Sequence, residues 1–426
     1  MATDVDVQYF SHLNGLVLGN NWGDLIRLLD TCLVNGLPLT SITSASIDDQ
    51  GDIHLTLYAS HNCMLFQIVE LSGFAPLELN GKYRIKGVPN ANTLILKAVH
   101  VGKVITTNGA AKLASLGYDI VFRDSVDVKR VYRAKDPSSV HPFIRVDETI
   151  SDGINSYTSS YAKSAMVGLL EHMNHIDDYA NPDVLQLPFD TNDPVKNWKI
   201  TGTETEVVRG WSKWYWATHS NFPKISTTEI AIVENAAGWG RTFTLCGNHD
   251  AFYFLQSGGS LWETKALSGA GIFNSALDSD VVPNWFLMTL LNNSPASASF
   301  GPINTGVTPL VDPPQFNPGR FLINNYNLVS LSNHAYALHL CPDSISGRSA
   351  LFPGTDVPAL EVAFRDDAPL SKLRGSLKHV LYAGKIINQN ITTPIIANKS
   401  MYVSDCCCVI SNANQGGFYF YLGEIE

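Results

Sequence analysis

Apolar and polar residues alternate in short runs between residues 53 and 99, which is the pattern of half-buried β-strands. The runs are separated by pairs of residue types that favour turns, namely Ser72-Gly73, Asn80-Gly81 and Pro89-Asn90. An Asn-Gly pair between two alternating runs is a strong hairpin signal, because both central residues of the tightest turn adopt positive φ angles. The pattern therefore predicts a small β-module over residues 40–105, with a hairpin turn at Asn80-Gly81.

A helical period precedes this module. Apolar residues recur at helical spacing at five positions, which are Leu25, Leu28, Leu29, Cys32 and Leu33. The pair Asn35-Gly36 supplies a stop signal, and Pro38 prevents the helix from continuing. We therefore predict an N-terminal arm with an amphipathic helix over residues 1–39.

Strands are predicted again from residue 110 onwards. The segment 128–148, VKRVYRAKDPSSVHPFIRVDE, predicts two strands around a Pro-Ser-Ser turn. Residues 157–180 fit either a helix or a strand with a period of two, and the sequence leaves both open. The last residues form an apolar alternating run that includes Phe418, Phe420 and Leu422. A strand this apolar must pair with something, within the subunit or across an interface.

Aromatic residues are dense between residues 196 and 260. The spacing of Trp211, Trp214 and Trp216 favours a strand with an aromatic face. Packing in the core of a β-sandwich is the preferred interpretation of this face. A platform of exposed rings that stacks on sugars is the alternative.

These patterns together predict a mainly β protein, built from sandwich-like or barrel-like modules with one or two short helices. A length of 426 residues favours more than one domain. The predicted units are the arm and helix 1–39, the β-module 40–105, a central aromatic-rich β domain 106–293, a Pro/Gly/Ser/Asn-rich loop or linker 294–320, and a C-terminal β domain 321–426.

Composition limits the classes of function. Only 16% of the residues are charged, the net charge is -10, and no run is rich in Lys or Arg, which argues against direct binding of nucleic acid. Residues 1–10 do not resemble a signal peptide, and apolar runs such as Trp285–Leu291 are too short to span a bilayer. The seven cysteines lack the Cys-x-x-Cys spacing of zinc sites, and a disulfide between subunits through Cys406–Cys408 stays open.

One tetrapeptide suggests metal chemistry. Residues 247–250 are Gly-Asn-His-Asp, which two-metal phosphoesterases use, and Asp52 with His54 supplies an upstream Asp-x-His. The Gly-Asp-x-x-Asp and Gly-His-x-His blocks of such enzymes are missing. We therefore predict that TFTLCGNHDAFYFLQ is a β-hairpin whose turn is Asn248-His249-Asp250.

A second group, His172 and His175 with Asp177 and Asp178, is more simply explained as a polar loop than as a metal site. Phosphate-binding glycine loops and a Gly-x-Ser-x-Gly elbow are absent from the sequence. We therefore predict no catalytic, cofactor-binding or metal-binding residues, and a protein that is not an enzyme.

Several stretches resemble structural proteins of tailed-bacteriophage virions. They are the β-module with its LNGKY and NANT sequences, then YRAKDPSSVHPFIRVDE, TFTLCGNHDAFYF and LSKLRGSLKHVLYAG. The likeness covers about residues 40 to 426, and Lys378-His379 stands where that group usually has Pro-Gly. It implies a virion component of the tail, baseplate or neck, assembled in the host cytoplasm.

The resemblance further implies a homo-oligomer or ring that docks to other virion proteins. The candidate interface comprises an edge of the β-module, the loop 294–320, the helix residues Leu25, Leu28, Leu29 and Leu33, and the C-terminal residues Phe418, Phe420 and Leu422. The alternative function is a receptor-binding or glycan-binding tail protein that uses Trp211, Trp214 and Trp216 on a host-surface glycan.

Overall fold

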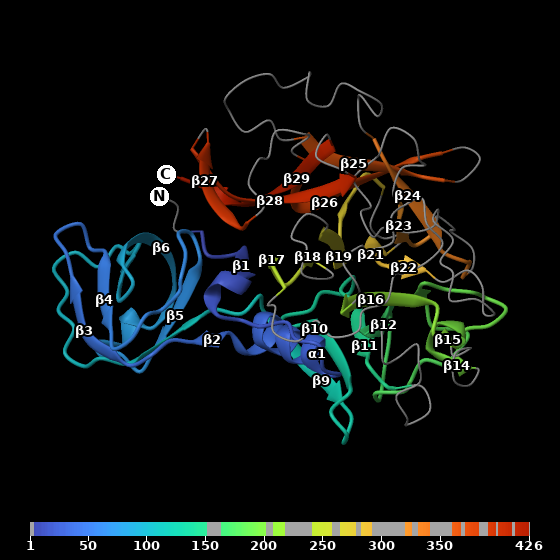
Figure 1. Cartoon of the computed structure of the whole chain (residues 1–426), viewed down its shortest axis with the longest axis horizontal. Coiled ribbons are helices and arrows are strands. Elements are labelled where there is room, and N and C mark those ends of the chain that lie inside the picture. Colours follow the sequence, from blue (N-terminus) through green and yellow to red (C-terminus); the bar gives the residue numbers. More distant parts are fainter. Residues whose placement is uncertain are drawn as a thin grey trace.

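The computed structural model is mainly β, as the sequence predicts. It describes residues 4–150, 163–201, 208–217, 241–257, 265–277, 283–291, 320–325, 331–340, 360–367, 371–382, 391–397, 399–410 and 414–425. The predicted loop 294–320 therefore lies outside the described residues, except for Arg320. Figure 1 shows a small module beside a larger part made of stacked sheets.

The N-terminal module is one antiparallel sheet. Its described strands run in the order β2-β8-β5-β6-β7-β4-β3. Alternate residues of β4 are buried, as expected for strands with one face on a core. The strands are β2 (Leu37–Pro38), β3 (Ile42–Ile47), β4 (Ile53–Leu57), β5 (Ile68–Ser72), β6 (Gly81–Asn90), β7 (Thr93–Leu96) and β8 (Ala110–Leu113).

The hairpin predicted at Asn80-Gly81 is wrong, whereas the turn after Pro89 is confirmed. A short 3-10 helix, η3 (Leu77–Leu79), lies between β5 and β6, and Asn80 ends it with a φ of -81°. The Asn80 side chain donates to the carbonyls of Phe74 and Leu77 and accepts from the Phe74 N–H. These local bonds hold Asn80 in an extended conformation, so the pair starts strand β6 instead of a tight turn.

The predicted helix is confirmed. It consists of α1 (Asp24–Leu29), which continues into a π-helical segment η2 (Asp30–Asn35) and ends at Gly36, where φ is +74°. The buried carboxylate of Glu148 accepts hydrogen bonds from the N–H groups of Gly23 and Ile26 at the start of α1. Burial raises the pKa of Glu148 to about 7.

The apolar stripe of this helix is not an interface, contrary to the prediction. Its side chains are at most 4% exposed and belong to the main hydrophobic core, together with residues of the module and of two further sheets. Helical spacing of apolar residues indicates a buried face, but it does not tell which partner buries it. The four residues are Leu25, Leu28, Leu29 and Leu33.

A second sheet covers one side of the larger part. It contains the predicted hairpin β10–β11, and within the ambiguous segment residues 163–170 form strand β12 rather than a helix. Its described order is β22-β16-β12-β11-β10-β9, with β13 also paired to β12. The strands are β9 (Tyr118–Arg123), β10 (Lys129–Ala134), β11 (Phe143–Asp147), β12 (Lys163–Leu170), β13 (Gln186–Leu187), β16 (Ser212–Ala217) and β22 (Leu290–Leu291). A small pair, β14 (Ile200–Thr201) and β15 (Val208–Arg209), lies apart from it.

The third and largest sheet begins with the first strand of the chain, β1. Its described order is β1-β17-β18-β19-β21-β23-β24-β25-β26-β29-β28-β27, with β20 paired to β26. The strands are β1 (Gln8–Ser11), β17 (Phe243–Gly247), β18 (Ala251–Ser257), β19 (Lys265–Ile272), β20 (Asn274–Ser275), β21 (Trp285–Met288), β23 (Arg320–Ile323), β24 (Ala335–His339), β25 (Leu360–Asp366), β26 (Leu373–Tyr382), β27 (Thr393–Ala397), β28 (Ser400–Ile410) and β29 (Asn414–Glu424).

Strands β17 and β18 lie between two hydrophobic cores. Phe252 and Phe254 face the core that includes α1 and the second sheet, whereas Tyr253 and Leu255 face the core of the C-terminal strands. Figure 1 shows this hairpin between the lower green strands and the upper red ones. A strand that is buried on both faces reads as a continuous apolar run, as AFYFL does. The core that includes α1 extends from the N-terminal module to Leu322, so it crosses the predicted domain boundaries. These boundaries stay a prediction.

Candidate functional site

The Gly-Asn-His-Asp tetrapeptide forms the turn between β17 and β18, as predicted from the sequence. The N–H of Asn248 donates to the carbonyl of Ala251 across a distance of 3.0 Å, which closes the hairpin. The Asn248 side chain accepts from the Asp250 N–H at 3.0 Å and donates to the Asp6 carboxylate at 2.7 Å. Asn248 is thus used as a turn residue that also anchors the N-terminal segment.

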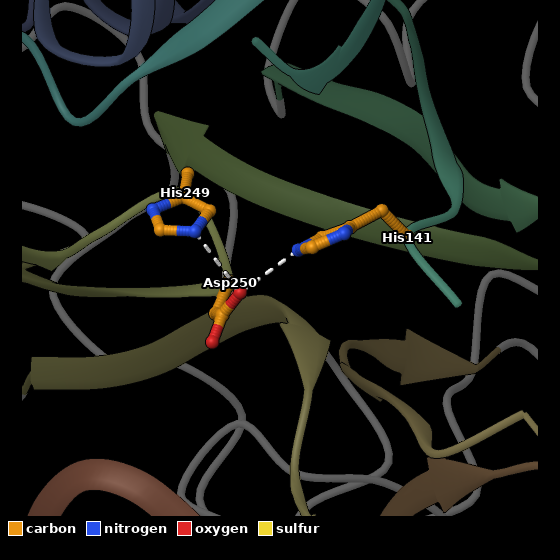
Figure 2. Close-up of side chains that lie close together, drawn as sticks. All are labelled: His141, His249 and Asp250. Atoms are coloured by element: carbon orange, nitrogen blue, oxygen red, sulfur yellow. Dashed lines mark hydrogen bonds and ion pairs between the residues drawn. The ribbon is translucent and has the colours of Figure 1, made fainter. Parts of the chain in front are cut away.

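Two histidines from different sheets meet at the carboxylate of Asp250 (Figure 2). His141 lies in the segment between β10 and β11, and its Nε2 is 2.8 Å from Asp250 Oδ1. His249 lies in the same turn as Asp250, with its Nε2 3.4 Å from the same oxygen. The side chain of His141 is 7% exposed and that of His249 is 42% exposed, so the cluster reaches from the interior to the surface.

A lysine completes the cluster on the other carboxylate oxygen. The ammonium of Lys378, on β26, donates to Asp250 Oδ2. The hydrogen bond from His141 and the Lys378 charge hold the pKa of Asp250 well below its usual range. Asp250 is therefore ionised at neutral pH, and it binds three side chains that come from three places in the chain.

The tautomer of His141 follows from its other nitrogen. The N–H of Ser138 donates to His141 Nδ1 across 2.9 Å, and the Ser138 hydroxyl lies 2.8 Å from the same nitrogen. A nitrogen that accepts a backbone N–H carries no hydrogen itself, so the proton of the neutral imidazole is on Nε2. His141 therefore donates through Nε2 to Asp250.

The bonds from Ser138 to His141 and from Lys378 to Asp250 disfavour a metal ion at this cluster. Among the described residues, His141, His249 and Asp250 are the group whose ligand atoms lie close enough for one ion, within 4.8 Å of one another. A metal on His141 Nε2 requires the opposite tautomer and the loss of the bond from Ser138. The Lys378 ammonium also already neutralises Asp250. The arrangement thus favours a hydrogen-bonded ion-pair cluster over a metal centre.

The other residues of the phosphoesterase hypothesis are located elsewhere, in the N-terminal module: Asp52 directly precedes β4 and His54 is on it. Asp52 is buried, binds Lys86 and Lys97, and accepts from the Ala98 N–H at 2.9 Å. His54 binds Asp48 at 2.9 Å. Within the part of the chain that the structure describes, they do not belong to the His141–His249–Asp250 group.

The second candidate metal group from the sequence is also not assembled. Asp177 binds the cations of Lys129 and Arg145 at 2.8 and 2.7 Å. His172 lies 3.1 Å from the side-chain oxygen of Asn174. In the described ranges the two histidines and the aspartates form no common ligand set, which agrees with a polar loop.

The proposed tryptophan platform is wrong. Trp214 is 1% exposed and Trp216 is fully buried, both in the main core, because their strand β16 is covered by neighbouring layers. Trp211 is partly buried, with the Lys196 ammonium 4.1 Å from its ring centre and the His334 ring at 4.9 Å. The three rings therefore offer no common surface to a sugar.

The C-terminal part of the predicted interface is also wrong. Phe418, Phe420 and Leu422 are fully buried in the second core. Strand β29 pairs with β26 on one side and with β28 on the other, so the apolar strand finds its partners within the subunit. The edge strand β3 of the module, in contrast, has no residue that is fully buried, so that part of the interface stays a prediction.

Sequence reasoning missed Ser138, His141 and Lys378. Asp250 lies 109 residues from His141 and 128 residues from Lys378, so no local spacing links them. The only local signal is the separation of three residues between Ser138 and His141 within the predicted turn.

Replacing Asp250 by Asn is expected to lower the free energy of unfolding by about 2 kcal/mol at neutral pH, because Lys378 and His141 both lose hydrogen bonds to a charged group. Because folding lowers the pKa of Asp250, its stabilising contribution is present above about pH 4 and is lost as the pH falls further. Urea unfolding at pH 7 and at pH 3 measures this. Asp119→Asn, at an exposed position on β9, is the control, and equal stability of Asp250→Asn and the unaltered protein at pH 7 would refute the prediction.

No helix in the described ranges has the length and apolar character needed to cross a membrane. Compared with the models of known protein families, the sequence matches none, and a search of the curated proteins also finds no match.

Proposed function

We propose that this chain is a structural component of a tailed-phage virion, in the tail, baseplate or neck. It acts by self-association and by docking to neighbouring virion proteins. The resemblance of residues 40–426 to such proteins supports this proposal, as does the mainly β architecture. A charged fraction of 16% also suits a subunit part of whose surface is covered by partners.

The two edges of the large sheet differ in how far they are covered, and this difference carries the proposal. At one end, hydrogen bonds with the N-terminal module cover the edge of β1. The buried Gln8 side chain donates to the carbonyls of Ile68 and Ala114 at 2.8 and 3.0 Å, and Gln67 donates to the Tyr9 carbonyl at 2.9 Å. This edge is therefore closed to further strands.

At the other end, β27 is the last strand of the described sheet. Among the described strands it pairs with β28 alone, and none of its five residues is fully buried. Ile396 is 56% exposed, and Ile391 just before the strand is 40% exposed. Pro394 is typical of an edge strand, because it lacks a backbone donor. An exposed edge with apolar side chains is a template for another strand.

Self-association through β27 is tested by the absolute mass of the full chain in light scattering. We expect a defined oligomer for the unaltered protein. The variant Ile396→Lys is expected to shift the mass to the monomer, because a charge at a joined sheet edge cannot be desolvated cheaply.

The matched control is Val126→Lys, which places the same charge at a residue that is 73% exposed between β9 and β10. Its oligomer mass should equal that of the unaltered chain. A monomeric unaltered chain across the concentration range, or an Ile396→Lys oligomer of unchanged mass, would count against assembly through this edge.

A further inference from the structure

The geometry points to a second property of this chain. We propose that Ser138 is an activated nucleophile that accepts an acyl group from a short ester, with His141 as its general base and Asp250 as the group that positions the base. This inference goes beyond the structural role proposed above and does not depend on it.

The three groups form a continuous chain of hydrogen bonds. The hydroxyl oxygen of Ser138 lies 2.8 Å from His141 Nδ1, and His141 Nε2 lies 2.8 Å from Asp250 Oδ1. These distances fall in the range of about 2.6–3.2 Å that links nucleophile, base and positioning carboxylate in covalent catalysis. Such a triad is recognised by geometry and roles, since it recurs on unrelated folds.

The tautomer is the one that a general base needs. Because the Ser138 N–H donates to His141 Nδ1, this nitrogen has a lone pair and no hydrogen, and it faces the Ser138 hydroxyl. The opposite nitrogen, Nε2, carries the proton that binds the carboxylate. The same tautomer that disfavours a metal ion on His141 leaves Nδ1 able to take the Ser138 proton, in exchange for the bond from the Ser138 N–H. The two nitrogens exchange the places that they have in the best-known serine proteases.

Lys378 and His249 keep the carboxylate in place. Lys378 binds Asp250 Oδ2, which leaves Oδ1 for His141, and His249 Nε2 lies 3.4 Å from Oδ1. An ionised carboxylate beside Nε2 stabilises the imidazolium that forms when Nδ1 takes the Ser138 proton. The Asp250 carboxylate is thus held by a contact within the β17–β18 turn and by one from β26.

Accessibility differs along the triad in the way that such chemistry requires. Residues 135–139, with Ser138 among them, are exposed, whereas His141 is buried. A substrate can therefore reach the serine from outside while the base is shielded from water. The exposed position suits a short acyl ester that is presented to the surface of the protein.

The chemical step balances without a further reactant. The Ser138 oxygen forms a bond to the carbonyl carbon of the ester, and the Ser138 proton moves to His141 Nδ1. The bond between that carbon and the leaving alcohol breaks, and the alcohol takes the proton from His141. The product is an acyl ester of Ser138, which water cleaves with His141 again acting as the base.

A fluorophosphonate probe on the folded full-length chain tests this assignment. The serine oxygen displaces fluoride from phosphorus, and the added mass is located by peptide mapping. We expect one label per chain, at Ser138. Ser138→Ala should abolish it, and His141→Gln should slow it by about 100-fold, which is the contribution of a general base.

Ser139→Ala is the matched control, because Ser139 is the exposed neighbour of Ser138. It should be labelled at the rate of the unaltered protein. Both serine variants change a surface side chain, so neither result depends on refolding of a core. Labelling of Ser138 no faster than in urea-unfolded protein, or equal labelling of Ser138 and Ser139, would overturn the proposal.

The role of Asp250 is tested separately, because it acts through His141. With p-nitrophenyl acetate as the ester, Asp250→Asn should lower kcat by about 100-fold and leave KM unchanged, and Asp250→Glu should restore part of kcat. A loss confined to KM, or no difference between the two variants, would remove Asp250 from the assignment. The oligomer mass is independent of all these readouts, so the two proposals fail or stand separately.

Discussion

Replacing Arg84 by Met is expected to lower the free energy of unfolding by about 4 kcal/mol, which is the cost of removing one partner from a buried charged network. The Arg84 side chain is 1% exposed. Its guanidinium donates to four backbone carbonyls, at Asp4, Val7, Phe66 and Leu422, with distances between 2.7 and 3.0 Å. Methionine fills a similar volume but leaves these carbonyls without their donors.

Burial lowers the pKa of Arg84 to about 10, so the guanidinium stays charged at neutral pH. Urea unfolding at pH 7 measures the loss, and Arg123→Met, at an exposed position on β9, is the control. The N-terminal segment should also become sensitive to limited proteolysis, because three of the five bonds go to Asp4 and Val7. A loss below about 0.5 kcal/mol, the size of an ordinary surface substitution, would contradict this account.

The second large effect is expected at the ion pair of Lys265 and Asp405. Both side chains are fully buried, one on β19 and the other on β28, which are not neighbours in the sheet. Asp405 also accepts from the Thr244 hydroxyl at 2.7 Å. Asp405→Leu or Lys265→Met alone should cost about 4 kcal/mol, because each removes one charge of a fully buried ion pair and keeps the other.

The double variant discriminates between a charge effect and a packing effect. When both charges are removed, neither remains to be desolvated, and a loss well below the sum of the single losses is expected. Urea unfolding of the four proteins completes the cycle. If the two losses simply add, the pair contributes through packing alone and this interpretation fails.

Local patterns predicted those elements whose partners are near in sequence. The leucine spacing and Gly36 gave the helix of residues 24–35, and the turn residues 248–250 gave the β17–β18 hairpin. The same reasoning failed at Asn80, where side-chain bonds to Phe74 and Leu77 decide the conformation. The preference of an Asn-Gly pair for hairpin turns is an average over many proteins, and the specific hydrogen bonds of Asn80 outweigh it here.

The sequence predicts that these apolar side chains are buried, but it does not predict what covers them. Leu29, Trp214 and Phe420 are apolar at regular spacing, and each lies in a core of the chain itself. A single sequence does not distinguish a side chain that is covered by its own chain from one that a second subunit covers. The Ser138–His141–Asp250 contact depends on the meeting of two sheets across 109 residues, which no periodicity encodes.

The Arg84 contacts have a consequence for synthesis on the ribosome. Strand β1 acquires its neighbour only when residues 243–247 have emerged, and the Arg84 anchor is complete only when Leu422 is available. Translation proceeds at about 5–20 residues per second, so Arg84 is synthesised tens of seconds before Leu422, its last partner. A chain that stops short of β29 lacks the bond from Arg84 to the Leu422 carbonyl, so residues of β29 complete the contacts that hold the segment around Asp4 and Val7.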